Sequence, residues 1–184
     1  MNDETAEKPR EADFFKVCGE CPHYGCCVRS RPPLTKKRMQ AINSYLTKNR
    51  IEIENAFEQE AYAYPRVKLD GHCVFFDNDA KKCRIHPVKP ETCVAGPITF
   101  DINKMTQKIE WFLKKDSICP LAANLYKKPD VYKKHMISAK RELERLILEL
   151  DAEALRAVLT VEEPETYKVG EDYAPESVLR KLKP

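Results

Sequence analysis

The N-terminal stretch Cys18-Gly-Glu-Cys21-Pro-His-Tyr-Gly-Cys26-Cys27 carries four thiols within ten residues. A C-x2-C pair such as Cys18 and Cys21 can grip one soft cation, because a tight turn aims both sulfurs the same way and backbone N–H groups stabilise the thiolates. We expect the rest of the fold to bring this group together with a second group of thiols. The second group is Cys73, Cys83, Cys93 and Cys119.

The composition is typical of one globular domain with a core of ordinary size. The chain has 184 residues, of which 42% are hydrophobic and 33% charged. A chain of this length buries about 70% of its unfolded surface, so the cysteines need not compensate for a missing core. The net charge of +3 comes largely from short basic pairs, which usually lie on solvated faces. We therefore do not expect nucleic acid as a partner, and a protein partner stays open.

The cysteine usage and the absence of targeting signals predict a cytoplasmic protein that does not enter a membrane. The N-terminus is polar and charged, unlike a signal peptide. No apolar run approaches the roughly 20 residues that span a bilayer. In a reducing cytosol, eight cysteines favour metal binding over disulfides, which are the alternative for an even cysteine count.

Apolar periodicity and turn residues predict an α+β protein. We expect a small, helix-rich domain in which one or two β-hairpins surround a cysteine-ligated metal centre, with a long C-terminal helix. The expected order is a disordered N-terminus over residues 1–13, a cysteine-cluster metal-binding domain over 14–126, a helical extension over 127–160 and an extended tail over 161–184.

Several helices are predicted from spacing and capping. Thr35 is a suitable N-cap for the first of them. Cys119 precedes a short helix, whose free N–H groups and dipole would lower the pKa of its thiol. His135 lies on the apolar stripe of the longest helix, which favours a core or surface histidine over a ligand. The expected helices cover residues 35–48, 51–62, 120–126, 130–150 and 151–159.

The stretch from Cys73 to Cys83 predicts a β-hairpin, because β-branched and aromatic residues flank an Asp-Asn-Asp turn. If the turn centres on Asn78, the two cysteines lie opposite each other on one face, with Cβ atoms about 5 Å apart. Strand alternation then places His86 on the other face from Cys83. A second hairpin is expected within residues 97–113.

Two cysteine patterns occur together in this chain: Cys18-x2-Cys21-x4-Cys26-Cys27, and Cys73-x-Phe75-Phe76 followed by Cys83-x-Ile85-His86-x2-Lys89-Pro90-x2-Cys93-x3-Pro97. They resemble the two signatures of the YkgJ-type cysteine-cluster proteins, and the resemblance covers about residues 14–125. It implies chelation of zinc or iron, and it implies no settled reaction.

Four features depart from the pattern of that family. Four residues precede the Cys26-Cys27 pair, where two or three are expected. His86 stands in place of a common tyrosine, Lys89 in place of a common arginine, and Val94 in place of a typical arginine. The departures concern the exact ligand set. Lys89 could hydrogen-bond sulfurs or anionic ligands, and we favour a solvated face for it.

All eight cysteines are candidate metal ligands; the alternative is that they are small buried hydrophobic residues. Cys26 and Cys27 are adjacent, and adjacent residues of an extended chain point in opposite directions. We therefore expect one of them to serve a second ion or a neighbouring iron. His23 is a candidate for completing a Cys₃His site, and the roles of His72 and His86 stay open.

Iron–sulfur clusters and Zn²⁺ both accept cysteine ligands, in two Cys₄ sites or in one cluster with spare thiols. Only Cys18 and Cys21 form a C-x2-C pair, and the later cysteines are widely separated. A cluster several ångströms across accepts ligands from distant segments more readily than one small ion does. The pattern therefore favours iron–sulfur slightly over zinc.

The resulting functional hypothesis is a cytoplasmic metal-binding protein that holds iron–sulfur or zinc centres through clustered cysteines, with a redox or metal-dependent role. Two alternatives stay open: an iron-dependent enzyme with an open coordination position, and a zinc-stapled module that contacts protein or nucleic acid. The sequence assigns no catalytic residue. It predicts that sulfurs from residues 18–27 lie within about 4 Å of sulfurs from residues 73–93.

Overall fold

The computed structural model describes residues 14–162 and 165–183. The disordered N-terminus expected over residues 1–13 lies outside the described residues. The fold combines helices, one of them long, with small antiparallel sheets, which confirms the α+β prediction. Among the described residues, no helix combines the length and the apolar character that crossing a membrane requires.

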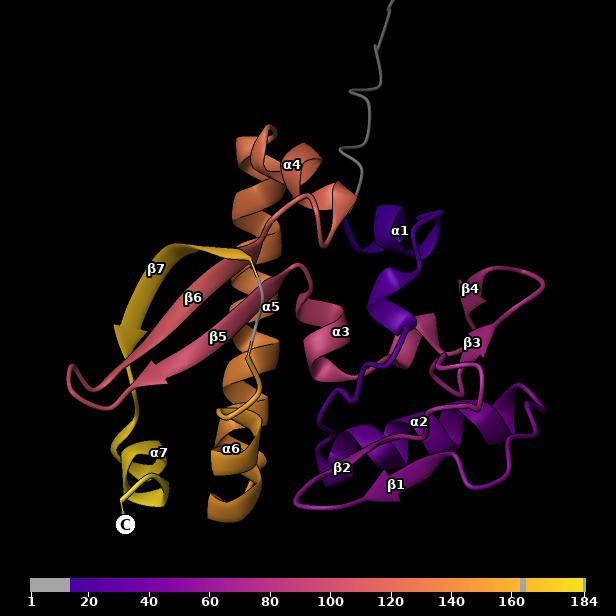
Figure 1. The fold of residues 1–184 in the computed structure, drawn as a ribbon, viewed down its shortest axis with the longest axis horizontal. Coiled ribbons are helices and arrows are strands. Elements are labelled where there is room, and N and C mark those ends of the chain that lie inside the picture. The colour runs from indigo at the N-terminus through magenta and orange to yellow at the C-terminus, as the bar shows by residue number, and fades with distance from the viewer. Residues whose placement is uncertain (1–13, 163–164, 184) are drawn as a thin grey trace, which may run out of the picture.

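The N-terminal region, residues 14–90, contains short elements joined by long irregular connections (Figure 1). Two two-stranded sheets, β1–β2 and β3–β4, lie in it beside helix α2. Its elements are α1 (Phe14–Gly19), the 3₁₀ turn η1 (Gly25–Cys27), α2 (Lys36–Lys48), β1 (Phe57–Gln59), β2 (Ala63–Pro65), β3 (Phe76–Asp77), β4 (Lys82–Cys83) and the 3₁₀ turn η2 (His86–Val88).

The C-terminal region, from residue 91 onward, is built on the long helix α5, beside which the three-stranded antiparallel sheet β5-β6-β7 lies (Figure 1). Helix α3 packs against α5 on the side that faces the N-terminal region. The elements are α3 (Glu91–Ala95), β5 (Ile98–Asn103), β6 (Lys108–Lys114), α4 (Pro120–Tyr126), α5 (Pro129–Glu149), α6 (Ala152–Val158), β7 (Thr166–Tyr173) and α7 (Glu176–Lys181).

Each region has its own hydrophobic core. The larger core lies in the C-terminal region, where Trp111 of β6 and Leu143, Leu146 and Ile147 of α5 are fully buried. The smaller core belongs to the N-terminal region and consists of Leu34, Ile42, Leu46, Ala56, Ala63, Val74, Phe75 and Ile85. Because the two cores are separate, a core substitution in one region can be compared with a core substitution in the other for its effect on stability.

Buried polar contacts join the two regions. The Thr35 hydroxyl donates a hydrogen bond to Glu91 Oε1 at 2.7 Å, and Arg38 Nε lies 3.5 Å from the same oxygen. Arg38 also pairs with Glu142 on α5. Burial raises the pKa of Glu91, against the opposing effects of Thr35 and Arg38. The joint is therefore an ion-pair network in which Arg38 serves two carboxylates.

The structure confirms most of the predicted helices. Residues 35–48 form α2, whose first turn is capped by Thr35 Oγ1 accepting from the Arg38 N–H at 3.0 Å. The Asp151 carboxylate caps α6 in the same way. Helices α4 and α5 and the β5–β6 hairpin also form where spacing and turn residues predict them.

The helix predicted over residues 51–62 is wrong, because this stretch turns into the β1–β2 hairpin. Arg50 and Asn55 have φ angles of 53° and 48°, a left-handed conformation that a right-handed helix cannot contain. Ile51 and Ile53 both pack against the N-terminal core, which is the period of an extended chain.

The β3–β4 hairpin forms, but its predicted register is wrong. Cys83 lies opposite Phe76, whereas the prediction placed it opposite Cys73. The turn explains the shift: the Asp77 carboxylate accepts hydrogen bonds from two N–H groups within it, each at 2.9 Å, and Lys81 adopts a φ of 53°. The turn is therefore centred after residue 78, and Cys73 precedes the paired strand.

The end of the chain holds more regular structure than the extended tail expected over residues 161–184. Strand β7 pairs antiparallel with β6, and α7 buries Val178 in the larger core. Cross-strand ion pairs stabilise the strand, since Lys168 contacts Glu110 at 2.8 Å and Lys108 contacts Glu171. The domain boundaries themselves stay a prediction.

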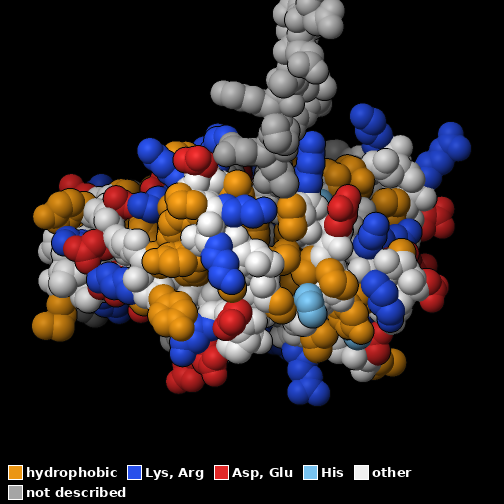
Figure 2. Space-filling view, turned by 90° about the horizontal axis from the view of Figure 1, so that it is seen from above, with side chains coloured by type: hydrophobic (Ala, Val, Ile, Leu, Met, Phe, Trp, Pro, Cys, Tyr) orange, Lys and Arg blue, Asp and Glu red, His pale blue; other side chains and the backbone are white. Residues whose placement is uncertain are grey.

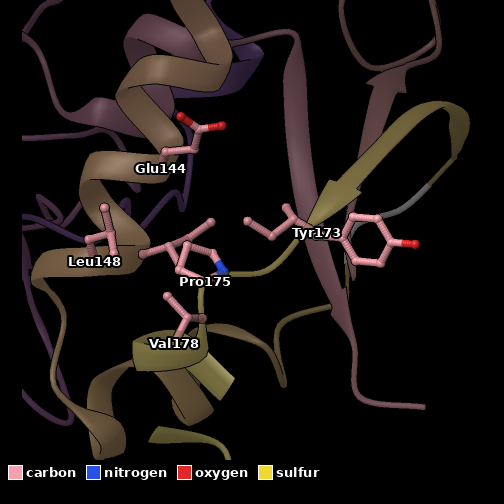
Figure 3. Close-up of a pocket in the computed structure, with 7 residues that line it drawn as sticks. Glu144, Leu148, Tyr173, Pro175 and Val178 are labelled. Carbon is pink, nitrogen blue, oxygen red and sulfur yellow. The ribbon is translucent and has the colours of Figure 1, made fainter. Parts of the chain in front are cut away.

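A small pocket of about 200 Å³ lies where α7 meets α5 and the end of β7. Pro175 and Val178 face Leu148 across it, and the Tyr173 ring turns away from them (Figure 3). Its lining is mostly apolar, with Glu144 at the rim. The pocket belongs to the C-terminal region and contains no thiol in its lining.

Candidate metal centre

The fold carries the cysteines on short elements and loops around the joint between the two regions. All eight are free thiols; Cys26 is exposed and the other seven are half-buried. Cys18 lies in the last turn of α1, and Cys26 and Cys27 lie in η1. Cys83 ends β4, Cys93 lies in α3, and Cys119 directly precedes α4. Thiols from distant parts of the sequence therefore come from both sides of the joint.

Backbone pairing fixes the N-terminal cysteine run beside Cys73. The Cys73 N–H donates to the carbonyl oxygen of Cys27 at 2.8 Å, and the Arg29 N–H donates to that of Gly71 at 2.7 Å. Val28 completes an antiparallel bridge with the residue before Cys73. This short ladder is the element that joins the first cysteine group to the second.

The thiols of five cysteines lie close enough to affect one another's ionisation. Burial, with smaller contributions from the neighbouring charges of Cys73 and Cys26, raises the pKa of Cys83 to about 11. Burial likewise raises the pKa of Cys93, again with contributions from Cys73, Cys83 and Cys26. The five cysteines of this group, here called the thiol cluster, are Cys26, Cys27, Cys73, Cys83 and Cys93.

Cys26 and Cys27 do not splay apart as an extended chain would make them. They lie in the tight turn η1, and their side chains are hydrogen-bonded to each other. The Cys27 thiol donates, which lowers the pKa of Cys26 to about 6, while the same bond and then burial raise the pKa of Cys27. The pair therefore lies in a 3₁₀ turn and not in extended chain, and the expectation that the two serve different metal atoms stays a prediction.

Cys119 lies at the edge of the thiol cluster, within electrostatic reach of Cys26 and Cys18. Its position before α4 was expected to lower its pKa, and that prediction is wrong. Backbone N–H groups of Leu121 and Ala122 do lower it, but burial has the larger effect and raises the pKa overall. A buried thiol loses more from desolvation than the helix end returns.

Cys18 and Cys21 have different surroundings. The Lys89 ammonium donates to Cys18 Sγ at 3.3 Å, so this thiol faces the inside of the molecule. The Cys21 thiol donates to the carbonyl oxygen of His23 at 3.5 Å, within its own exposed loop. The C-x2-C pair is thus the least organised part of the candidate ligand set.

The histidines are held by neighbours other than thiols. The His72 ring stacks on Phe76, with centroids 4.9 Å apart, and His86 Nε2 lies 3.0 Å from the carbonyl oxygen of Phe15. His135 is buried with its Nε2 3.0 Å from the Ala95 carbonyl oxygen, which agrees with its interpretation as a core residue. These contacts account for His135, and the roles of His72 and His86 stay open.

The donor chemistry fits a metal, although the side chains do not surround a single point. Within residues 14–162 and 165–183, no three His, Cys, Asp or Glu side chains are placed so as to hold one ion. Half-buried thiols with raised pKa values are nonetheless suited to a soft cation. The charge of the cation replaces the protons and removes the repulsion between the thiolates. The predicted approach of the two cysteine groups to within about 4 Å stays a prediction.

For Lys89 the sequence favoured a solvated face over a hydrogen bond to sulfur, and the structure reverses that preference. The residue is only 5% exposed, and its ammonium lies 4.7 Å from the centre of the Phe15 ring as well as beside Cys18. The hint in the sequence was the position of Lys89 between Cys83 and Cys93, two candidate metal ligands.

A family model described as "CxxCxxCC: Putative zinc- or iron-chelating domain" matches residues 17–120, which is more than half of the chain. The chain is also similar to an uncharacterized protein of Methanocaldococcus jannaschii, with 30% identity over 103 residues. That match covers 53% of this chain and 56% of the relative, so the chain spans about half the length of the curated relative. No solved structure matches the chain.

Proposed function

Because this chain belongs to the family of zinc- or iron-chelating domains whose model matches residues 17–120, we propose that its cysteines hold a thiolate metal centre at the joint between the two regions. Metal binding is the property that the family description supports. The identity of the centre, its ligands and its role are the further content of this proposal.

The observation that carries the proposal is the thiol cluster itself. Five thiols from four separate segments, with Cys26 exposed and the others half-buried, interact electrostatically, and burial is the main cause of the raised pKa of Cys73, Cys83 and Cys93. Without a cation, the four members with raised pKa values, Cys27, Cys73, Cys83 and Cys93, stay protonated and gain little from their proximity. A metal that displaces the protons turns the same proximity into binding free energy.

We assign the thiol cluster as the main ligand group, with Cys18 and Cys119 at its edge and Cys21 joining when a metal is bound. The ligands then come from α1, η1, the loop before β3, β4, α3 and the residue before α4. Ligands spread over so many segments suit an iron–sulfur cluster slightly better than single zinc ions. Zn²⁺ remains the alternative, since zinc also accepts four thiolates.

The proposed setting is the cytoplasm, where free thiols persist, and the proposed role is redox or metal-dependent. The upper face of the molecule carries basic and acidic side chains interspersed from end to end (Figure 2). That mixture supports the expectation that nucleic acid is not the partner, because nucleic-acid sites concentrate one sign of charge.

Metal and sulfide analysis of anaerobically purified protein tests the proposal. We expect iron with stoichiometric acid-labile sulfide and a brown protein; stoichiometric zinc without sulfide would keep the metal centre and replace the cluster. Cys83→Ser and Cys93→Ser should lose the metal, whereas His135→Gln, whose buried ring lies beside the backbone carbonyls of Ala95 and Gly96, should retain it. Protein that carries neither metal and takes up neither on reconstitution contradicts the proposal.

A further inference from the structure

Lys89 is a buried cation at the boundary of the thiol cluster. It follows η2 and precedes α3, and its side chain is 5% exposed. The ammonium donates to Cys18 Sγ at 3.3 Å and lies 4.7 Å from the centroid of the Phe15 ring. Both of these partners come from α1, so Lys89 ties α1 to the segment that carries Cys93.

The surroundings of Lys89 lack the partner that a buried lysine normally has. Lysine is almost never fully buried without an opposite charge, because desolvating an ammonium costs several kcal/mol. Elsewhere in the protein this rule holds: Arg38 serves Glu91 and Glu142, and Lys140 pairs with Asp172 at 2.6 Å. Among the described residues, no carboxylate forms an ion pair with Lys89.

The positive charge of Lys89 acts on thiols beyond Cys18. It lowers the pKa of Cys26, Cys83 and Cys93, in each case against larger or comparable effects of burial. The nearest groups able to carry a negative charge are therefore thiols, and they become anions when they bind a metal. A neutral thiol is a weak acceptor, whereas a thiolate is a strong one.

We propose that Lys89 is the counter-charge of the thiolate metal centre, and that its ammonium donates a charge-assisted hydrogen bond to the metal-bound sulfur of Cys18. This inference rests on the proposed function. Several thiolates carry more negative charge than a divalent metal or a cluster cancels, so the loaded centre supplies the anion that the buried ammonium lacks. Lys89 is thus a positioning residue that does not itself bind the metal.

The proposal predicts opposite effects of one substitution in two states of the protein. Lys89→Met keeps the length and apolar stem of the side chain and removes its charge. In the metal-free protein Cys26 is the one member of the thiol cluster with a lowered pKa, so Lys89 faces mostly neutral thiols, and removing its buried charge should leave the melting temperature equal or raise it. In the loaded protein the substitution removes the counter-charge, so the affinity for metal should fall.

The experiment titrates metal-free wild-type protein and variants with Zn²⁺ against a competing chelator, and records thermal unfolding with and without Zn²⁺. We expect Lys89→Met to weaken Zn²⁺ binding by about tenfold or more, the range seen when partners of metal ligands are lost. Lys89→Arg, which keeps the charge, should stay within about threefold of wild type. Lys89→Gln, which can donate a hydrogen bond without charge, should behave like Lys89→Met.

Lys181→Met is the matched control. Lys181 is half-buried, and it donates to the carbonyl oxygens of Ile147, Leu148 and Leu150 in the C-terminal region. Its loss should destabilise the metal-free and loaded proteins alike and leave Zn²⁺ affinity unchanged. Should Lys89→Met fail to fold without metal, the comparison of Lys89→Gln with Lys89→Arg decides in its place.

Two results overturn the inference, and they are distinguishable. If Lys89→Met and Lys89→Gln bind Zn²⁺ as tightly as wild type, or lower stability equally in both states, Lys89 is a packing residue against Phe15 and the metal centre stands without it. If wild-type protein itself binds no Zn²⁺ and no iron, the proposed function fails before any variant is compared.

Discussion

The two regions of this protein differ in what holds them together. The C-terminal region has a three-stranded sheet, a long helix and a core that includes Trp111, Leu143 and Leu146, all fully buried. The N-terminal region has two-stranded sheets with strands of two or three residues and a much smaller core. Isolated two-stranded hairpins are marginal in water. The region with most of the thiols is therefore the one least able to stabilise itself.

Removing the metal should give the largest effect, and it should fall on the N-terminal region. Structural thiolate sites contribute about 10–16 kcal/mol of apparent binding free energy, compared with about 5–15 kcal/mol of net stability for a whole domain. After chelation, hydrogen exchange should speed up across residues 14–90, while the amides of α5 keep their protection. Equal loss of protection in both regions would remove the distinction between them.

The joint between the regions should be the next most sensitive place. Arg38→Met leaves Glu91 without its cation and Glu142 with Arg145 alone, and breaking a buried pair in this way costs about 3–5 kcal/mol. Urea unfolding followed by circular dichroism measures the change. Arg31→Met is the control, because its pair with Glu60 is exposed on both sides and is worth less than about 1 kcal/mol. Equal effects of the two substitutions would show that the regions are held together by other contacts.

Leu146→Ala tests whether the C-terminal region is stabilised by its own core. The side chain is fully buried, so its truncation should cost about 2–5 kcal/mol of unfolding free energy. Metal content should not change, since the cavity lies in the larger core. Leu148 lies two residues further along α5 and is 48% exposed, so Leu148→Ala should have little effect on stability. Loss of metal from Leu146→Ala would mean that the two regions fold as one unit.

The smallest effect concerns pH and lies at the edge of the sheet. The Asp172 carboxylate accepts from Lys140 and from the Trp111 indole N–H, both at 2.6 Å, and the Lys140 contact is the main cause of its lowered pKa. A folded pKa below the unfolded value stabilises the protein above that unfolded pKa, about 4, and the contribution is lost as pH falls.

Asp172→Asn should therefore lower the unfolding free energy at pH 7 and make little difference near pH 3. Because Asp172 is half exposed, solvent screening keeps the expected cost below about 1 kcal/mol. Denaturant unfolding of both proteins at the two pH values gives the difference. A cost that is equal at both pH values would assign the role of Asp172 to packing instead of charge.

The sequence predicted most of the helices and the second hairpin, because these depend on local signals. Thr35 and Asp151 cap helices wherever their side chains reach the first turn, and the stripe of α5 is long enough to be unambiguous. The β3–β4 register could not be predicted, because it depends on the Asp77 carboxylate accepting hydrogen bonds from two N–H groups of its own turn. The β1–β2 hairpin was missed for a similar reason, because left-handed Arg50 and Asn55 leave no mark in helical spacing.

The candidate site was predictable in its residue types and not in its arrangement. Cysteine spacing pointed to metal, and the fold brings Cys26 and Cys27 beside Cys73, Cys83 and Cys93. For Lys89 the sequence favoured a solvated face over a hydrogen bond to sulfur, because lysine side chains usually lie in solvent. Burial depends on the packing of α1 against the segment after η2, which is a tertiary contact.

The position of β7 late in the sequence matters for what the protein exposes while the ribosome is synthesising it. Every cysteine precedes residue 120, whereas the strand that completes the β5-β6-β7 sheet begins at Thr166. Translation proceeds at about 5–20 residues per second, so the nascent chain presents a full set of thiols for seconds before its C-terminal scaffold can close. Delivery of metal during that interval would shield the thiols from oxidation and order the weaker half of the molecule first.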